Sequence, residues 1–245
     1  ITGNYDRVGG QQPILHTYIH QASGFLTEEE EFVDEVRPAH ARKPVGAERF
    51  PLWYETEREA QATDMARQIL EEKPYPIRAV VALGMNLRML PDTENIIRAL
   101  KKLDFFVDTD LFMTDAAKYA DIVLPACSSF ERGEFKTYPG GYAVYTNPVI
   151  EPLGQAKSDA QILCELAEAL GLDDELLKSG YENCIRYMIR NLSVTVEELK
   201  ANPLPTLVPE RKPYQEGAYI QGGLDTKSGK FELDSSLIKD HPEWG

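Results

Sequence analysis

The sequence IRAVVALGMNLRMLPDTENIIRALKKLDFFVDTDLFMTDAAKYADIVLPACSSFERGE spans Ile77–Glu134 and decides the fold. It holds three short apolar runs separated by helix-like segments, and each run ends in turn-forming or polar residues: Ala79–Leu83, Phe105–Val107 and Ile122–Leu124. This pattern is typical of parallel strands that are buried on both faces. In open α/β sheets the ligand usually lies beyond the carboxyl ends of the strands. We therefore expect three segments to converge on one site: Gly84–Asn86, Asp108–Asp110 and Cys127–Glu134.

The second strand of this stretch, Asp104–Thr109, brings two carboxylates to the expected ligand edge. Alternation along a strand points Asp108 and Asp110 to the same face. A carboxylate there can accept two parallel hydrogen bonds, and guanine offers two adjacent N–H donors. A second interpretation, which the residues alone favour, is that Asp110 caps a helix that begins near Thr114.

A long connection, Ala126–Asn147, follows the third strand. Long loops without their own helices or strands are commonly binding loops, so we expect a functional role for this one. Arg132 can hold a phosphate or a carboxylate through two hydrogen bonds, or it can form an exposed ion pair with Glu131 or Glu134. We expect Cys127 to be a packed thiol rather than a thiolate ligand.

Capping residues and periodicity predict the elements outside this stretch. Thr56 and Glu59 form a capping-box pattern that predicts a helix ending near Lys73. Further helices and strands are predicted from the same signals: helices over Asp92–Leu103, Asp159–Leu170 with Ser158 as cap, Tyr181–Leu192 and a short one from Thr195, and strands over Tyr142–Ile150 and Lys230–Leu233.

Composition narrows the function classes. The 245 residues, of which 42% are hydrophobic, can bury one substantial core. A net charge of −14 argues against a nucleic-acid partner, because phosphate binding needs clustered Lys and Arg. No apolar run approaches the ~20 residues of a membrane span, so direct membrane insertion is not expected. Three cysteines without a C-x-x-C pair encode no zinc or iron–sulfur site, and His16 and His20 are expected to be surface or packed residues.

Two further absences are informative. The chain contains neither G-x-G-x-x-G nor G-x-x-x-x-G-K-[ST], which disfavours a nicotinamide or nucleoside-triphosphate site. It begins ITGNYDRVGG, without an initiator Met, a basic leader or an apolar signal segment. We therefore expect it to be cut from a longer polypeptide, and the sequence assigns no compartment.

Several motifs follow one another in an order that resembles a known family. They are Ile1–Asn4 with Gly9 and Gly10, Gly84–Asn86, Asp110–Thr114 with Ala120–Pro125, Glu131 with Gly133, and Thr226–Leu233. In this order the chain resembles the molybdopterin oxidoreductases of the dimethyl sulfoxide reductase class. The match through Asp110–Thr114 and Ala120–Pro125 is the most specific.

The resemblance implies a fold, a domain plan and a cofactor. Large subunits of this class hold two molybdopterin guanine dinucleotides between two Rossmann-like domains and a C-terminal barrel, with molybdenum or tungsten between the pterins. This chain resembles the third domain, which takes the guanine end of one cofactor. The implied fold is an α/β Rossmann-like parallel sheet with helices on both faces. The implied plan is an irregular segment over 1–55, the cofactor-binding domain over 56–200, and an extended connector over 201–245 toward a further domain.

The resemblance also assigns roles to residues. Asp110 becomes the leading contact to the guanosine portion, which reverses the preference for a helix cap. Asp108 stays a candidate, although the family position there is commonly apolar. The remaining candidates are Gly84 and Asn86 under the nucleotide, and Arg132 and Asp159 beyond the third strand. No catalytic residue and no metal ligand is expected in this chain.

For the parent enzyme the resemblance implies two-electron redox chemistry or oxo transfer. Its expected partners are the other domains of the same large subunit and an iron–sulfur electron-transfer subunit, with room for an iron–sulfur cluster bound upstream of residue 1. The chain alone is expected to be inactive. The alternative hypothesis is a non-catalytic α/β module that binds a small nucleotide or mediates assembly.

Overall fold

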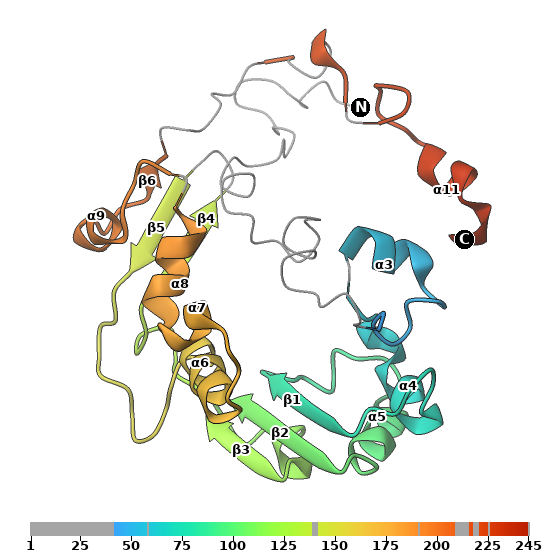
Figure 1. The fold of residues 1–245 in the computed structure, drawn as a ribbon, viewed down its shortest axis with the longest axis horizontal. Helices are drawn as coiled ribbons and strands as arrows, with labels where there is room; N and C mark the ends of the chain where they lie inside the picture. Colours follow the sequence, from blue (N-terminus) through green and yellow to red (C-terminus); the bar gives the residue numbers. More distant parts are fainter. Residues whose placement is uncertain are drawn as a thin grey trace.

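The computed structural model describes residues 42–57, 59–138, 142–190, 192–208, 216–217, 221–224 and 226–244. The motif at the start of the chain, both early histidines and the Gly140-Gly141 pair lie outside these residues. No helix among the described residues is long and apolar enough to cross a bilayer. The helices and strands follow in this order (Figure 1): α3 (Pro51–Glu57), η1 (Ala62–Asp64), α4 (Met65–Glu71), β1 (Ala79–Leu83), α5 (Thr93–Leu100), β2 (Phe105–Asp110), η2 (Ala117–Tyr119), β3 (Ile122–Pro125), β4 (Glu134–Tyr138), β5 (Tyr142–Thr146), α6 (Asp159–Ala169), α7 (Glu175–Lys178), α8 (Tyr181–Met188), α9 (Val196–Ala201), β6 (Thr206–Leu207), α11 (Ser236–Asp240) and η3 (Pro242–Trp244).

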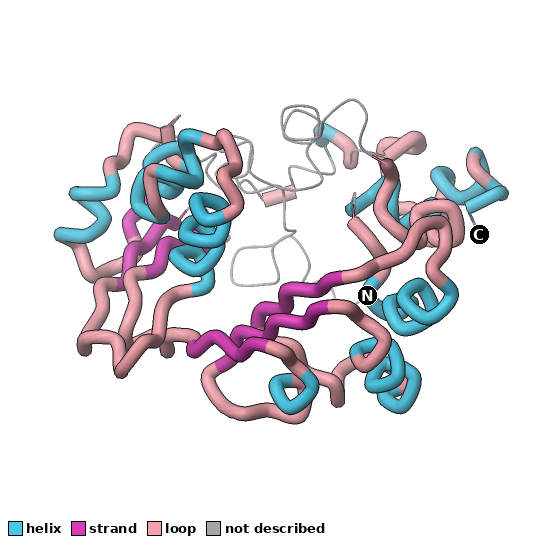
Figure 2. The backbone as a smooth tube through the Cα atoms, turned by 60° about the horizontal axis from the view of Figure 1, so that its bottom comes forward, coloured by secondary structure: helices cyan, strands magenta, loops and turns pink. Residues whose placement is uncertain are grey.

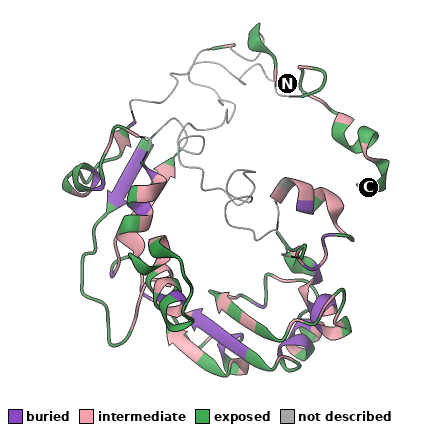
Figure 3. Ribbon diagram, in the orientation of Figure 1, coloured by how far each residue is buried: buried purple, intermediate pink, exposed green. Residues whose placement is uncertain are grey.

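The first sheet is the predicted parallel sheet, with strand order β1-β2-β3. Its β1 has the predicted bounds, and β2 and β3 each run slightly past the predicted apolar run. In register, Ala82 lies beside Asp108, which lies beside Val123. The central strand β2 is the most buried of the three (Figure 3). The predicted α/β class with a parallel sheet is confirmed.

Helices α4 and α5 cover one face of this sheet. The predicted helix begins at Thr93, and Asp92 caps it by accepting a hydrogen bond from the Asn95 N–H at 3.4 Å. The apolar faces of both helices pack on Phe106 of β2 in one core, whose buried members are Ala66, Ile69, Leu87, Ile96, Ala99, Leu100, Phe106 and Ala116. Helix α6 lies on the opposite side, where Ile162 and Leu166 approach β3. Helices therefore lie on both faces, but they cover them unequally.

A second, antiparallel sheet forms from β4, β5 and β6, and Figure 2 shows its strands apart from those of the first sheet. The prediction of a long loop over Ala126–Asn147 is wrong, because β4 lies within it and pairs with β5. The predicted strand from Tyr142 ends at Thr146 rather than Ile150. This sheet packs with α8 and α9 in a second core: Ala143, Tyr145, Ile185, Ile189, Val196, Leu199 and Val208.

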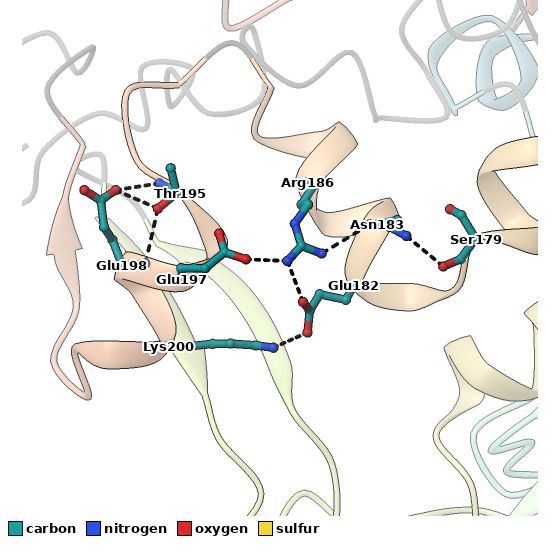
Figure 4. Close-up of polar contacts among 8 residues, drawn as sticks. All are labelled: Ser179, Glu182, Asn183, Arg186, Thr195, Glu197, Glu198 and Lys200. Atoms are coloured by element: carbon teal, nitrogen blue, oxygen red, sulfur yellow. Dashed lines mark hydrogen bonds and ion pairs between the residues drawn. The ribbon is translucent and has the colours of Figure 1, made fainter.

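Polar contacts fix α8 against α9 on the surface of the second core (Figure 4). Arg186 donates to Glu182 at 2.6 Å and also pairs with Glu197, and Lys200 pairs with Glu182. The predicted cap of α9 is confirmed as a capping box between Thr195 and Glu198.

Three predicted elements differ in extent or type. The helix predicted from Thr56 to Lys73 is divided into α3, η1 and α4, because Thr56 lies near the end of α3 and Gln61 caps the next turn. Helix α8 ends at Met188, before the predicted Leu192. The strand predicted over Lys230–Leu233 is absent from the described residues, since this segment folds back through local side-chain bonds: Thr226 Oγ1 donates to Lys230 O at 2.8 Å and Ser228 N to a Glu232 oxygen at 3.1 Å.

Candidate functional site

Backbone hydrogen bonds join the carboxyl ends of the three parallel strands side by side. The Gly84 N–H donates to Thr109 O at 2.8 Å, and the Ala126 N–H donates to Asp110 O at 3.1 Å. Asp110 therefore lies between the loop that follows β1 and the loop that follows β3. The expected convergence of these loops on one edge is present.

Further backbone hydrogen bonds join the end of β3 to the residues just before α6. The Cys127 N–H donates to Lys157 O at 2.8 Å, and the Lys157 N–H donates to Pro125 O at 3.1 Å. Ser158 then caps α6 by accepting a hydrogen bond from the Gln161 N–H, as predicted. Asp159, the first residue of α6, is therefore held beside the end of β3.

Asp110 ends the central strand and has one carboxylate oxygen free. Its Oδ1 accepts a hydrogen bond from the Leu111 N–H at 2.6 Å, and Oδ2 has no hydrogen-bond partner among the described residues. The helix-cap interpretation of Asp110 is wrong, because the turn that follows is the short η2 and its Ala117 N–H donates to Thr114 Oγ1 at 3.3 Å.

Asp108 lies on the same face as Asp110 but is fully buried. In the part of the chain that the structure describes, neither carboxylate oxygen accepts a hydrogen bond, and the neighbouring Thr109 Oγ1 is also unpartnered. Burial raises the pKa of Asp108, and the Asp110 carboxylate adds to the rise. The Met85 backbone amide offsets part of it. Its surroundings therefore favour the neutral form of Asp108 more than water favours it for an exposed carboxyl group.

Gly84 and Asn86 shape the loop that follows β1. Gly84 adopts a positive φ of 67°, which favours glycine, and an added Cβ would meet no atom within 4 Å. The glycine is therefore required by conformation rather than by space. Asn86 Oδ1 accepts a hydrogen bond from the Arg88 N–H at 3.0 Å, which fixes the turn, and Arg88 pairs with Asp115 at 3.2 Å.

Glu131 organises the loop that follows β3, a role that the sequence interpretation missed. Its buried carboxylate accepts hydrogen bonds from Ser128 N at 2.7 Å, Ser128 Oγ at 2.6 Å and Leu153 N at 2.7 Å. The Ser128 hydroxyl and the Leu153 amide hold the pKa of Glu131 below its usual value. The signal was available, because Ser128 and Glu131 have the S-x-x-E spacing of a capping box.

Arg132 extends from this loop toward α6. It donates to Cys127 O at 3.3 Å and lies 3.6 Å from a Glu134 carboxylate oxygen and 3.9 Å from one of Asp159. The predicted ion pair with Glu134 is present, whereas Glu131 makes other bonds. Cys127 is buried, as predicted, and burial raises the pKa of its thiol. The other two cysteines, Cys164 and Cys184, are only half-buried.

The six predicted site residues thus form two groups along one edge. Gly84, Asn86, Asp108 and Asp110 gather where β1 and β2 end. Arg132 and Asp159 pair with each other beyond β3, where they line a small hollow of about 150 Å³ together with Tyr181.

Comparisons with known proteins identify the family of this chain. Residues 11–169 match a family model described as molybdopterin oxidoreductase. The chain is 37% identical over 188 residues to Probable oxidoreductase YoaE of Bacillus subtilis (strain 168), an alignment that covers 75% of this chain and 27% of that protein. It is 31% identical over 185 residues to acetylene hydratase of Syntrophotalea acetylenica, covering 74% of this chain and 24% of the relative.

A solved structure is also similar. Acetylene hydratase from Pelobacter acetylenicus superposes with a TM-score of 0.60 at 27% sequence identity, and the match covers 75% of this chain and 25% of that one. The chain therefore spans about a quarter of the length of the relatives that it matches.

Proposed function

The chain belongs to the molybdopterin oxidoreductase family, and we propose that the carboxyl edge of its parallel sheet holds the guanine-nucleotide end of one molybdopterin guanine dinucleotide. One observation carries the proposal. The free oxygen of Asp110 lies at the end of the central strand, between the loops that begin at Gly84 and Ala126. Ligands of open α/β sheets bind at this edge.

A guanine base fits the acceptors that this edge presents. Its pairing edge has adjacent N–H donors, and an ionised carboxylate is an acceptor only. Asp110 Oδ2 has room for one donor, and Oδ1 already accepts from Leu111 and can be shared. The corresponding edge of adenine places an acceptor nitrogen against the carboxylate, so the edge favours guanine over adenine.

The loop after β1 supports the nucleotide. Gly84 has no side chain, so its backbone surface stays open to a ligand, and the Asn86 side chain holds the turn closed through Arg88. We assign Gly84 and Asn86 to the surface on which the nucleotide lies. Asp108 lies behind this surface as a second carboxyl group.

Arg132 is placed to meet a phosphate at the far end of the row. Its contacts with Glu134 and Asp159, at 3.6 and 3.9 Å, are long for ion pairs, so a phosphate oxygen can replace one of them. Asp159 then holds the guanidinium in place. The backbone N–H groups in the first turn of α6 add a favourable field for an anion.

When bound, the cofactor supplies a molybdenum or tungsten centre for two-electron redox chemistry or oxo transfer. The residues of this chain orient one end of it and set its electrostatic surroundings. We therefore propose a parent oxidoreductase that is completed by other domains of the same large subunit and by an iron–sulfur electron-transfer subunit. By itself the chain is expected to be inactive.

Titration with GDP, followed by amide chemical shifts, tests the proposal. We expect GDP to shift the amides of Gly84, Asn86 and Leu111, and ADP to shift them less. Asp110→Asn replaces one acceptor oxygen with a donor, so it should raise the dissociation constant for GDP at least about tenfold, as the loss of a hydrogen bond to a charged group predicts.

The matched control is Asp173→Asn, which alters a carboxylate that is 97% exposed and far along the chain from this edge. It should leave GDP binding unchanged. Equal shifts with GDP and ADP would instead favour a general nucleotide-binding module. Shifts confined to other parts of the chain, or none at millimolar GDP, would contradict the assignment of Asp110.

A further inference from the structure

A hollow of about 710 Å³ lies between residues 42–49, which precede α3, and residues 73–75, which lead into β1. Its lining is rich in cations, although the whole chain has a net charge of −14. Five of the side chains that line it are basic: Arg42, Lys43, Arg49, Arg67 and Lys73. Among the described residues, Glu48 is the one acidic side chain in the lining. A concave surface with an excess of one sign of charge attracts ions of the opposite sign.

A buried carboxylate holds two of these cations in place. Asp64, which is 8% exposed, accepts hydrogen bonds from Arg49 Nη1 at 2.9 Å and from Arg67 Nε at 2.8 Å. The buried Gln68 side chain donates to the same carboxylate at 3.2 Å. Arg67 also pairs with Glu71 at 2.8 Å, so the two guanidinium groups are balanced by two carboxylates. These arginines therefore form a fixed wall, and the charge of the hollow comes from the other three cations.

The other three cations, Arg42, Lys43 and Lys73, form no ion pair with a residue that the structure describes. Two of them lie against aromatic rings instead. The guanidinium carbon of Arg42 is 5.7 Å from the centre of the Tyr75 ring, and Lys43 Nζ is 4.8 Å from the centre of the Tyr54 ring. The face of an aromatic ring attracts a cation without neutralising its charge. These side chains are therefore positioned but keep their charge available to a ligand.

The loop that carries Lys43 is fixed by its own contacts. Tyr75 Oη donates a hydrogen bond to Lys43 O at 3.0 Å, which ties this loop to the segment before β1. Gly46 has a positive φ of 84°, and an added Cβ would lie 2.3 Å from Gln68 Nε2. The loop thus approaches α4 as closely as a glycine allows. Groups that are fixed before a ligand arrives lose less conformational entropy on binding, which favours affinity.

The size and charge of the hollow limit the kind of ligand. Its volume falls within the ~300–1,000 Å³ of small-molecule sites. Glu48 offsets one of the three charges of Arg42, Lys43 and Lys73, which leaves a surplus of two positive charges. The fork of N–H donors on an arginine matches the oxygens of a phosphate or a carboxylate. A compact oxyanion with two or more negative charges therefore fits the hollow.

We propose that this hollow binds a compact oxyanion that carries two or more phosphate or carboxylate groups. The site is separate from the nucleotide edge, because Lys73 and Tyr75 precede β1 whereas Gly84 follows its other end. The proposal does not depend on nucleotide binding, since it uses neither Asp110 nor Arg132.

Titration of the ¹⁵N-labelled chain with sodium pyrophosphate, followed by amide chemical shifts, tests the site. We expect pyrophosphate to shift the amides of Lys43, Gly46 and Tyr75. The amides of Gly84 and Leu111 report on the nucleotide edge, so binding there is scored separately. A second titration with citrate shows whether phosphate or carboxylate groups bind more tightly, and either order supports the site. Acetate, which carries a single charge, should bind at least about tenfold more weakly than the tighter of the two.

A pair of double variants tests the cations. Lys43→Gln with Lys73→Gln removes two unpaired charges and should raise the dissociation constant for pyrophosphate at least about tenfold. The matched control, Lys118→Gln with Lys178→Gln, changes the net charge equally at two lysines outside the hollow. It should change the dissociation constant less than about twofold, because surface charges are screened by salt.

Three results would overturn the proposal. Equal weakening in the two double variants would assign the binding to the net charge of the chain rather than to the hollow. Acetate binding as tight as that of pyrophosphate would remove the requirement for two charges. The absence of shifts at Lys43 and Tyr75 with both pyrophosphate and citrate at millimolar concentration would leave the hollow without an oxyanion ligand.

Discussion

The two sheets of this protein differ in how completely their apolar side chains are buried. The antiparallel sheet encloses a core in which Ala143, Ile185, Leu199 and Val208 are each 0% exposed. The exposed apolar side chains of this sheet lie at strand ends: Tyr138, Tyr142 and Leu207. The parallel sheet leaves Val81, Leu83, Phe105 and Ile122 at least 40% exposed, yet it buries Asp108 without a partner. Figure 3 shows that β5 is largely buried, whereas β1 and β3 are intermediate or exposed.

The comparison teaches which region is complete by itself. A region that hides its apolar residues and satisfies its polar ones gains nothing from a ligand or partner. A region with exposed apolar side chains and a buried carboxyl group without a hydrogen-bond partner lacks both apolar and polar contacts. We therefore interpret the parallel sheet as the part of the molecule that contacts a ligand or partner.

A matched pair of leucine truncations tests this contrast most strongly. Leu199→Ala opens a cavity in the closed core and should lower the free energy of unfolding by about 3 kcal/mol. Leu83→Ala changes a side chain that is 43% exposed and should cost less than about 1 kcal/mol. Urea unfolding measures both. Equal losses would mean that the open face is already packed, and the contrast would fail.

The next largest effect is expected at Gly133, where the loop that follows β3 contacts Tyr145 in the core of the antiparallel sheet. A Cβ at Gly133 would lie 2.2 Å from Tyr145 Oη and 2.8 Å from the ring carbon that bears it. Gly133→Ala should therefore cost about 2 kcal/mol through overpacking, measured by urea unfolding. Gly222→Ala, where an added Cβ meets nothing within 4 Å, is the control. An unchanged stability in Gly133→Ala would show that the hairpin moves away from the loop freely.

The buried carboxyl group of Asp108 should make the stability of the protein depend on pH. Because burial raises the pKa of Asp108 in the folded state, the folded state binds its proton more tightly than the unfolded state does. The free energy of unfolding therefore falls as the pH rises from the unfolded pKa of about 3.9 through the raised folded pKa. Asp108→Asn removes this loss and should raise the free energy of unfolding at pH 8.

The gain should shrink toward zero as the pH falls to about 4. Urea unfolding of both proteins across this range gives the comparison, with Asp173→Asn as an exposed control that changes neither end. A loss at pH 8 would mean that Asp108 is ionised and partnered, and a gain that is independent of pH would mean that its pKa is the same in the folded and unfolded states.

The smallest effect is expected on the surface of the closed region. Arg186→Gln removes the ion pairs to Glu182 and Glu197 shown in Figure 4. Because these groups are exposed, we expect only a slight fall in the melting temperature at low salt, and no difference from the unmodified protein in about 1 M NaCl. A difference that persists in high salt would assign Arg186 a packing role instead.

The sequence predicted the parallel sheet well because its signals are local. The apolar run of β1 was predicted to the residue, and the caps Asp92, Ser158 and Thr195 act within four residues of themselves. The motif order also identified the family, since a motif depends on its own residues and spacing. The hairpin of β4 and β5 was missed, although two alternating runs flank Gly140-Gly141 in the sequence.

What the sequence by itself determined, then, is the order of strands in the parallel sheet, the carboxylates carried to its edge and the family. Only the tertiary structure decided which carboxylate stays free, since Asp108 and Asp110 are two residues apart and differ only in what covers them. It also decided that Glu131 ties two loops together while Arg132 reaches α6, and that one face of the sheet stays open. Burial and pairing arise from contacts between distant segments, and no local pattern in the chain specifies them.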